Sequence, residues 1–337
     1  MTAEKVAAER PQTLTELFTL ARENLKEKGQ DRQMPSGSNY LASSEANRRL
    51  LDSVFMEPKF LDPVQPDTSL TLFGARMKTP AFCSALSKPG QFTDEEMADL
   101  VRGMGNAGSM MMLGIGGSEM LQLAIDTGAP VVKMVKPYRE TELIYTKVKD
   151  AESRGCVAVG IDIDHFYGTY RDGRSTMADT FSPKQMDEIR QAISLTKLPF
   201  MLKGVLSLAD AQKAIDLGAS AIAVSNHGAG SFDFGVPAIV ALPTLAEAVG
   251  DKLTILVDTG FRTGNDMFKA LAFGAQGVGF ATQILLAASA GGAIGVEEFI
   301  GFVTGELKRT MAITGCADLS AIDRSLLIAS PEVRKWW

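Results

Sequence analysis

A pattern that repeats from about residue 80 onward constrains the fold of this chain most. A short apolar run is followed by a Gly-rich or polar turn and then by an amphipathic stretch, and this unit occurs eight times. Apolar runs of this length are typical of strands that are buried on both faces of a parallel sheet. The predicted strands are Ala81–Ala85, Ser109–Leu113, Pro130–Met134, Val157–Ile163, Phe200–Lys203, Ala221–Ser225, Thr254–Val257 and Gly277–Phe280.

Helical patterns fill the intervals between these runs. Ser207 with Asp210 resembles a capping box, and Ser182 before Pro183 predicts an N-cap with proline at the first helical position. Eight successive β-then-α units with right-handed connections close most naturally into a (β/α)8 TIM barrel. A doubly wound open sheet is the alternative, but eight strands are many for it, and no GxGxxG motif follows the first strand. The clearest predicted helices are Asp94–Asn106, Glu140–Ser153, Pro183–Ser194, Leu208–Leu217 and Gly264–Phe273.

Residues 1–79 precede the barrel and are predicted to form an N-terminal helical extension packed on it. Helices are expected over Thr13–Glu27 and Ser44–Phe55, and a short strand, Leu70–Phe73, is expected to cover the floor of the barrel. The length alone would also fit two medium domains. Because no Pro- or Gly-rich linker divides the chain, we expect residues 80–337 to form the barrel of a single-domain protein.

Composition excludes several classes of protein. The net charge of −6 argues against a nucleic-acid partner, which would require a basic face. The N-terminus has no apolar leader, and the weakly apolar run Ala281–Val296 is too short to span a bilayer. Cys83, Cys156 and Cys316 lie far apart, so a disulfide framework or a metal site such as zinc is not expected. We therefore expect a cytoplasmic enzyme without a membrane partner.

Polar residues follow the apolar runs of four successive predicted strands. In barrels of this type the active site forms at the carboxyl ends of the strands, so these side chains should share one rim. Four successive strands with ionisable groups at this end indicate a functional site rather than chance. The residues are Asp162 and Asp164 after the fourth strand, Lys203 in the fifth, Ser225, Asn226 and His227 after the sixth, and Asp258 and Arg262 after the seventh.

His227 is the best candidate for a general base. It is one of two histidines, the other being His165, and a single histidine is more often structural than catalytic. Its position in a Ser-Asn-His-Gly turn at a strand end favours catalysis, because imidazole accepts protons near neutral pH. Asp164 would orient the ring and stabilise the imidazolium. Lys203 either forms a salt bridge with Asp164 or Asp258, or places a cation against an anionic reduced cofactor.

The loops after strands seven and eight are the common phosphate site of such barrels. Here they read Asp258-Thr259-Gly260-Phe261-Arg262 and Gly279-Phe280-Ala281-Thr282. Glycine lets the backbone approach an anion, a helix N-terminus favours it, and arginine adds charge. A phosphate-bearing ligand is the expected occupant.

Three linked motifs resemble the FMN-dependent 2-hydroxy acid oxidase family, which includes glycolate and lactate oxidases. They are Met201-Leu202-Lys203-Gly204-Val205, the run Ala221–Gly228, and the Asp-x-Gly-x-Arg-x-Gly-x-Asp run that starts at Asp258. The tail Glu306–Cys316 resembles the closing helix of that family. The match is strongest over residues 198–325.

The resemblance implies FMN as cofactor and assigns roles to individual residues. His227 would be the base, Asp164 its carboxylate partner, and Lys203 a cation at the flavin N1/O2 edge. Arg171 would bind the substrate carboxylate. A 2-hydroxy acid would become a 2-keto acid as the α-hydrogen passes to flavin N5 as hydride, with a carbanion route as the rival. The other implied cofactor contacts are Ala85, Lys133, Asp162, Ser225, Asp258, Gly260, Arg262, Ala281 and Thr282.

The chain departs from the family pattern around the substrate and the cofactor. Gly230 stands where a second carboxylate-binding arginine is usual, and Thr263 and Thr282 stand in place of arginines at the phosphate site. Val135 or Lys136 takes the position of an expected tyrosine, and residues 25–29 lack another. Lys133, Gly114 and Asp162 replace the glutamine, serine and threonine expected around the ring. We therefore expect retained flavin chemistry, an altered substrate and weaker FMN binding.

Two other functions fit the same sequence. A different FMN barrel enzyme, such as one resembling isopentenyl diphosphate isomerase or an NAD(P)H-dependent reductase, would explain Gly230 through a substrate without a carboxylate. A degenerate barrel without catalysis is the second, and the intact His227, Asp164 and Lys203 argue against it. The partners implied by the leading hypothesis are a small-molecule substrate and an electron acceptor, namely oxygen, a quinone or another acceptor. The resemblance also implies a homo-oligomer, a tetramer or octamer.

Overall fold

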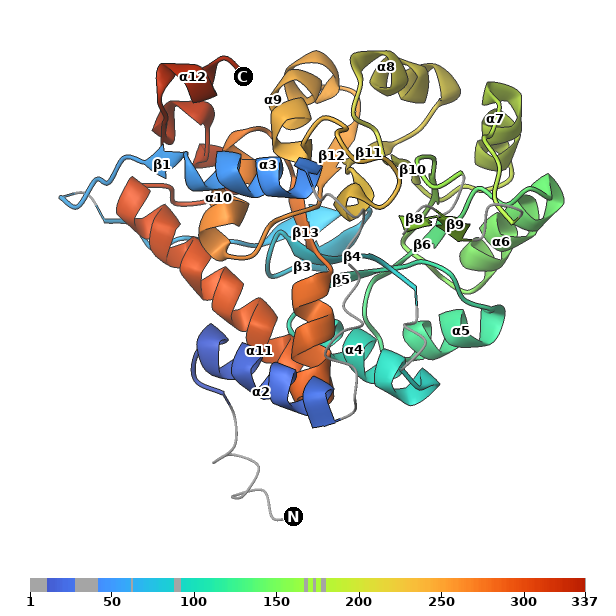
Figure 1. The fold of residues 1–337 in the computed structure, drawn as a ribbon, viewed down its shortest axis with the longest axis horizontal. Helices are drawn as coiled ribbons and strands as arrows, with labels where there is room; N and C mark the ends of the chain where they lie inside the picture. The colour runs from blue at the N-terminus through green and yellow to red at the C-terminus, as the bar shows by residue number, and fades with distance from the viewer. Residues whose placement is uncertain are drawn as a thin grey trace.

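Eight parallel strands form a closed barrel at the centre of the protein (Figure 1). The computed structural model describes residues 11–27, 42–61, 63–87, 92–166, 169–171, 174–176 and 180–336. The strands pair in chain order and β13 closes the ring against β4, so the predicted (β/α)8 barrel is confirmed. The barrel strands are β4 (Ala81–Leu86), β5 (Met110–Leu113), β6 (Val131–Val135), β7 (Ala158–Asp162), β10 (Phe200–Lys203), β11 (Ala221–Val224), β12 (Thr254–Val257) and β13 (Gly277–Phe280).

Helices surround the barrel and follow its strands. The Ser207 hydroxyl accepts a hydrogen bond from the Asp210 amide at 3.1 Å, and Gly218 ends the same helix in the left-handed conformation, as predicted. The helices are α4 (Asp94–Asn106), α5 (Ser118–Asp126), α6 (Thr141–Ser153), α7 (Met186–Ser194), α8 (Leu208–Leu217), α9 (Ala238–Val249), α10 (Gly264–Ala272) and α11 (Thr282–Thr314).

The predicted start of α7 at Ser182-Pro183 is wrong. The backbone N–H of Ser182 donates to the Pro137 carbonyl at 2.9 Å, and Phe181 forms a β-bridge with Tyr138, which holds this segment extended. The helix begins only at Met186, where Gln185 and Glu188 form a capping box. Tertiary pairing thus overrides a local N-cap signal.

Strand alternation sorts the apolar side chains into two layers. Phe82, Met134, Met201 and Leu256 belong to a cluster inside the barrel. The intervening strand residues, among them Val135, belong to the larger cluster between the barrel and its helices. Because successive strand residues point to opposite faces, a residue two positions beyond an inward one also faces inward. This rule decides which polar residues reach the mouth of the barrel, meaning the carboxyl ends of its strands.

The N-terminal segments pack on the barrel. Helix α2 (Leu14–Glu27) lies against α11, and α3 (Ala42–Asp52) lies against α9. The expected strand near Leu70 is confirmed as β2 (Leu70–Leu72), which pairs with β3 (Ala75–Met77) in a hairpin. Leu72 and Met77 of this hairpin pack into the inner apolar cluster, so the hairpin closes the amino end of the barrel.

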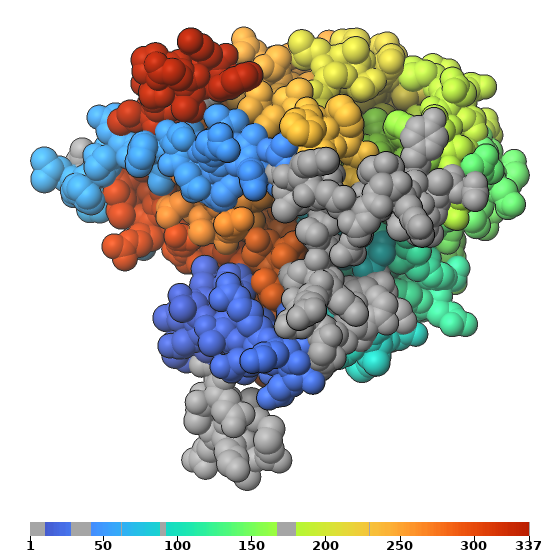
Figure 2. Space-filling model, in the orientation of Figure 1, coloured from blue at the N-terminus to red at the C-terminus, as the bar shows by residue number. Residues whose placement is uncertain are grey.

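The C-terminal segment returns to the N-terminal part of the chain. Strand β1 (Phe55–Met56) pairs with β14 (Leu327–Ile328) in an antiparallel manner. Figure 2 shows the surface of α3, in blue, between the red C-terminal segment and the orange surface of α10 and α11. These contacts favour the single-domain interpretation. The remaining short elements are β8 (Thr169–Arg171), β9 (Arg174–Thr176), α12 (Pro331–Arg334) and the 3-10 turns His227–Ala229, Leu319–Ala321 and Arg324–Leu326.

Helix α11 is long and apolar enough, within the described part of the chain, to cross a membrane by length and composition alone. Gly291 and Gly292 break it with non-helical backbone angles, and one face of it is buried against α2, α4 and α10. This burial and the kink are typical of a helix in the outer layer of a barrel. All three cysteines are buried and free.

Candidate active site

Six strands direct a polar side chain into the mouth of the barrel. Each of these residues lies two positions beyond an inward-facing residue, for example Lys203 after Met201 and Asp258 after Leu256, so alternation places them in one layer above the inner apolar cluster. All of them are buried. We call this set the polar layer, and its members are Ser84, Lys136, Asp162, Lys203, Ser225 and Asp258.

Lys203 lies at the centre of the polar layer. Its Nζ donates to the Ser225 hydroxyl at 3.0 Å and lies 3.5 Å from a carboxylate oxygen of both Asp162 and Asp258. Burial alone would lower the pKa of Lys203, but the two carboxylates outweigh it and raise the pKa above its ordinary value. The lysine therefore remains a cation at every physiological pH.

Asp162 is completely buried and shared between two lysines. Its Oδ2 accepts from Lys136 Nζ at 2.6 Å, and its Oδ1 faces Lys203. Burial favours the neutral acid, but the charges of Lys136 and Lys203 prevail and hold the pKa of this carboxyl well below its usual range. Asp258 accepts a hydrogen bond from the Ser84 hydroxyl at 2.9 Å.

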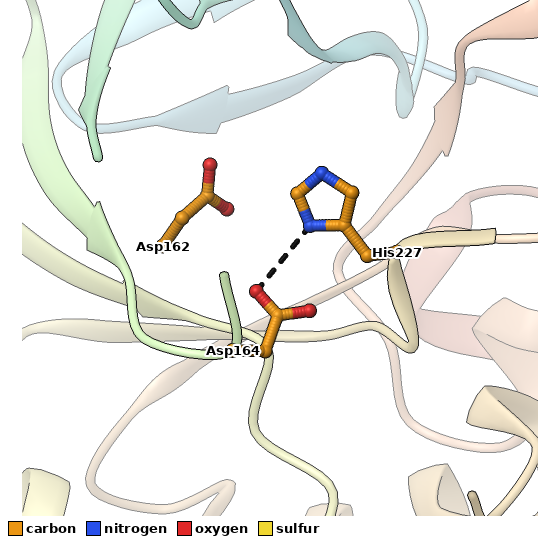
Figure 3. Close-up of side chains that lie close together, drawn as sticks. All are labelled: Asp162, Asp164 and His227. Atoms are coloured by element: carbon orange, nitrogen blue, oxygen red, sulfur yellow. Dashed lines mark hydrogen bonds and ion pairs between the residues drawn. The ribbon is translucent and has the colours of Figure 1, made fainter. Parts of the chain in front are cut away.

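His227 stands at the rim beside the polar layer, and Asp164 holds its ring. The His227 Nδ1 lies 3.3 Å from Asp164 Oδ1. Figure 3 shows this contact, with the second ring nitrogen on the far side of the imidazole. Burial would raise the pKa of Asp164, but the adjacent imidazole outweighs that effect and lowers it. The carboxylate thus fixes Nδ1 as the protonated nitrogen and leaves Nε2 to accept a proton.

Two backbone features place this pair. Gly204 adopts φ +98°, and a Cβ there would come within 2.5 Å of Asp164, so only glycine lets this carboxylate approach. His227 itself adopts φ +54°, and its amide donates to the Ser225 hydroxyl at 3.1 Å. A non-glycine residue in this region costs about 1–3 kcal/mol and persists mainly at functional sites.

His165 is a feature of the site that the sequence did not indicate. Its ring stacks on that of His227 with the centroids 4.7 Å apart. The centroid of the Phe181 ring lies 5.5 Å from that of His165. Burial, followed by the charge of Lys136, lowers the pKa of His165 to about 3, so this histidine stays neutral. Only tertiary structure brings the two imidazoles together.

Asp162, Asp164 and His227 each place a possible metal ligand atom within 4.8 Å of the others. A divalent cation prefers carboxylates whose charge is not already compensated. Asp162 carries two lysine partners, and Asp164 is engaged with the imidazole. The arrangement therefore fits acid–base chemistry better than metal binding.

The sequence of this chain matches the model of the FMN-dependent dehydrogenase family over residues 21–186 and 173–329. The chain belongs to this family. FMN is accordingly its cofactor, and the predicted resemblance is confirmed.

Individual relatives agree with this assignment. The chain is 28% identical to 4-hydroxymandelate oxidase of Amycolatopsis orientalis over 326 residues, which cover 86% of this chain and 91% of the relative. It is 29% identical to glycolate oxidase 3 of Arabidopsis thaliana over 333 residues, which cover 86% and 89%. A crystal structure of a mandelate oxidase variant superimposes with a TM-score of 0.85 at 29% identity, and the alignment covers 94% of this chain and 98% of that one. This family member therefore shares the fold of 2-hydroxy acid oxidases over nearly its whole length.

The residues at the mouth fit the phosphate and ring of FMN. Arg262 is exposed at the start of α10 and forms no ion pair with any described residue. Helix α11 begins at Thr282 without a side-chain cap on Ala281, which leaves its N-terminus available to an anion. Asn226 is buried, and neither polar atom of its side chain has a hydrogen-bond partner among the described residues. Buried amides normally have hydrogen-bond partners, so this side chain fits a position that contacts a bound ligand.

The loop after β12 is held in shape by α3. The Asn47 side chain donates to the Thr259 carbonyl at 2.8 Å, and Arg48 donates to the Gly260 carbonyl and pairs with Asp266 at 2.7 Å. Thr259 and Gly260 have φ of +83° and +81°. The strained turn is thus fixed by its contacts with α3.

The structure brings most of the predicted site residues together and sets some apart. Asp162, Lys203, Ser225, Asp258, Asp164 and His227 share the mouth, and Ala85 packs against the inner cluster. The loops with Gly260, Arg262, Ala281 and Thr282 follow the neighbouring strands β12 and β13. Arg171 lies in β8, but its side chain is outside the described part of the chain.

Lys133 does not join this group. It falls between Val132 and Met134 of the inner cluster and therefore points outward, where its Nζ donates to the Gly114 carbonyl. Burial, then the charge of Lys147, lowers the pKa of Lys133 to about 8. Of the two residues that the resemblance placed at the expected tyrosine, Val135 or Lys136, it is Lys136 that reaches the mouth, two positions beyond the inward-facing Met134. The alternation of side chains along β6 predicts this arrangement.

Proposed function

We propose that this protein oxidises a 2-hydroxy acid to a 2-keto acid, with His227 as the general base. One observation carries the proposal: the imidazole stands at the rim with Nδ1 held 3.3 Å from Asp164, beside a buried layer that contains the cation Lys203. The relatives named hydroxymandelate oxidase and glycolate oxidase support this substrate class.

Each residue has a defined part in this reaction. His227 Nε2 accepts the proton of the substrate hydroxyl, and Asp164 stabilises the imidazolium that forms. FMN, when bound, supplies the acceptor for the α-hydrogen and its two electrons. Lys203 would supply positive charge to the bound cofactor, which gains negative charge on reduction.

The substrate contacts differ from those expected of a standard member. Gly230 is buried and carries no side chain that could bind a carboxylate, and the adjacent Ser231 is directed at Asp164, 3.4 Å away. Arg171 is then the arginine proposed to bind the acid. A single arginine in place of two would hold a small carboxylate weakly and leave room for a larger substituent.

Anaerobic reduction of the bound flavin tests this function. Glycolate, lactate, mandelate and longer 2-hydroxy acids are mixed with the purified yellow protein, and bleaching of the flavin absorbance is followed. His227→Ala should keep the flavin and slow its reduction by about 10²–10⁴-fold, the usual contribution of a general base. Unchanged reduction in that variant would refute the assigned role.

Gly230 also favours a second candidate, an FMN barrel enzyme whose substrate has no carboxylate, such as an NAD(P)H-dependent reductase or an isomerase resembling that of isopentenyl diphosphate. The same experiment with NADH and NADPH separates the two. Bleaching by a nicotinamide but by no 2-hydroxy acid would replace the leading proposal.

A further inference from the structure

Lys136 and Asp162 form a buried ion pair that the proposed reaction does not use. Their Nζ and Oδ2 atoms lie 2.6 Å apart, and the exposed fractions of the two side chains are 4% and 0%. The desolvation of a buried pair commonly cancels its attraction, so such a pair gives little net stability. Its position at the mouth, at the ends of the adjacent strands β6 and β7, indicates a role toward the ligand instead.

The pair is one end of an alternating row of charges. Asp162 continues to Lys203 at 3.5 Å, and Lys203 continues to Asp258 at 3.5 Å. With the signs plus, minus, plus and minus, these four buried groups sum to zero. Without Lys136, the cation Lys203 would stand between two carboxylates and the row would carry one net negative charge.

We propose that Lys136 sets the reduction potential of bound FMN by neutralising Asp162. A flavin gains negative charge when it is reduced, and a buried negative charge nearby opposes that gain with little screening. Lys136 cancels this charge and thereby leaves the field of Lys203 free to favour the reduced cofactor. The inference rests on FMN as the cofactor and is independent of the substrate.

The sign of the effect can be tested with three variants. Lys136→Met makes the row negative and should lower the midpoint potential of the flavin, whereas Asp162→Asn makes it positive and should raise the potential. The double variant removes one charge of each sign and should return the potential to near that of the parent protein. Each single change should alter the equilibrium between reduced and oxidised flavin by about tenfold or more, which is about 30 mV for a two-electron couple.

Lys269→Met is the matched control. Lys269 is also a buried lysine, but it lies in α10 outside the barrel and donates to the Leu51 carbonyl. Its removal should leave the potential unchanged. The measurement is a dye-coupled reductive titration of holoprotein at one pH, with the flavin absorbance confirming occupancy in each variant.

Several results would overturn the inference. They are shifts of the same sign in both single variants, shifts in neither, or a double variant farther from the parent than the single ones. If Lys136→Met loses FMN, the other two variants still test the idea. Asp162→Asn must raise the potential, and the double variant must return it to near the parent value. Failure of every 2-hydroxy acid to reduce the flavin would refute the proposed function. It would not affect the shifts in potential that are expected here, because they depend on bound FMN and not on the substrate.

Discussion

Asp164→Asn tests how strongly the carboxylate supports the base. The variant keeps the shape of the side chain and removes its charge, 3.3 Å from the His227 ring. Two unit charges about 4 Å apart interact by about 4 kcal/mol near a protein surface and by about 1 kcal/mol in bulk water. The exposed fractions of His227 and Asp164 are 22% and 14%, so their interaction lies between these limits, at about 2–3 kcal/mol.

In the proposed reaction this energy applies to the imidazolium, which forms only as the hydroxyl proton is taken. We therefore expect the rate of flavin reduction by saturating substrate to fall about 100-fold, since each 1.4 kcal/mol is a factor of ten. Stopped-flow absorbance of the flavin measures this rate directly. Ser231→Ala is the matched control, because the Ser231 hydroxyl donates to the other Asp164 oxygen over a long distance of 3.4 Å. Its rate of flavin reduction should fall by less than about threefold. Equal losses in the two variants would refute an electrostatic role for Asp164.

Three further predictions follow from charges elsewhere in the structure. Arg262→Ala should weaken FMN binding about 10–100-fold, the value of one charge-assisted contact, as measured by fluorescence titration of the apoprotein. Lys133→Met should retain FMN and raise the free energy of unfolding at pH 7 by about 1–3 kcal/mol, because the pKa of this buried lysine is lowered to about 8 and its cation is penalised below that pH. His165→Phe should make stability less dependent on acid pH. The pKa of His165 is lowered to about 3 in the folded protein, whereas in the unfolded chain it lies near 6.5. The parent therefore loses stability from this residue as the pH falls from about 6.5 to about 3, and the variant does not. Urea unfolding at pH 7, 5.5 and 4.5 checks the last two.

The barrel was predictable because each of its strands has a recognisable local sequence pattern. Each is an apolar run of similar length, and all eight runs became strands of one closed sheet with ends that differ by about a residue. The polar residues that follow them were predictable for the same reason. A barrel converts the ends of its strands into one rim, so Asp162, Lys203 and Asp258 meet although they lie far apart in the chain.

What could not be predicted depends on register and on contacts across the fold. Motif alignment assigned Lys133 to the cofactor, whereas alternation with Met134 turns it outward and brings Lys136 to the mouth. The stack of His165 on His227 joins residues from two loops and leaves no local pattern. The start of α7 moved because the bridge between Tyr138 and Phe181 extends the segment before it.

One hydroxyl group links His227 to the polar layer. Ser225 Oγ accepts from Lys203 Nζ at 3.0 Å and from the His227 amide at 3.1 Å, so it ties the strained turn at φ +54° to the central cation. Loss of this hydroxyl removes the contact that holds the turn, since strained backbone persists only where its surroundings fix it. Ser225→Ala should therefore slow flavin reduction about tenfold, and the loss of two hydrogen bonds should lower stability by about 1–3 kcal/mol.

Ser84→Ala is the comparison, because Ser84 is a buried hydroxyl of the same layer that donates to Asp258 and has no contact with the turn. It should lose similar stability and keep the rate of flavin reduction within about threefold. If both variants slow the reaction equally, the position of His227 does not depend on Ser225. The turn would then be held by its other contacts, which are the Asp164 contact and the hydrogen bond from the Gly230 amide to the His227 carbonyl.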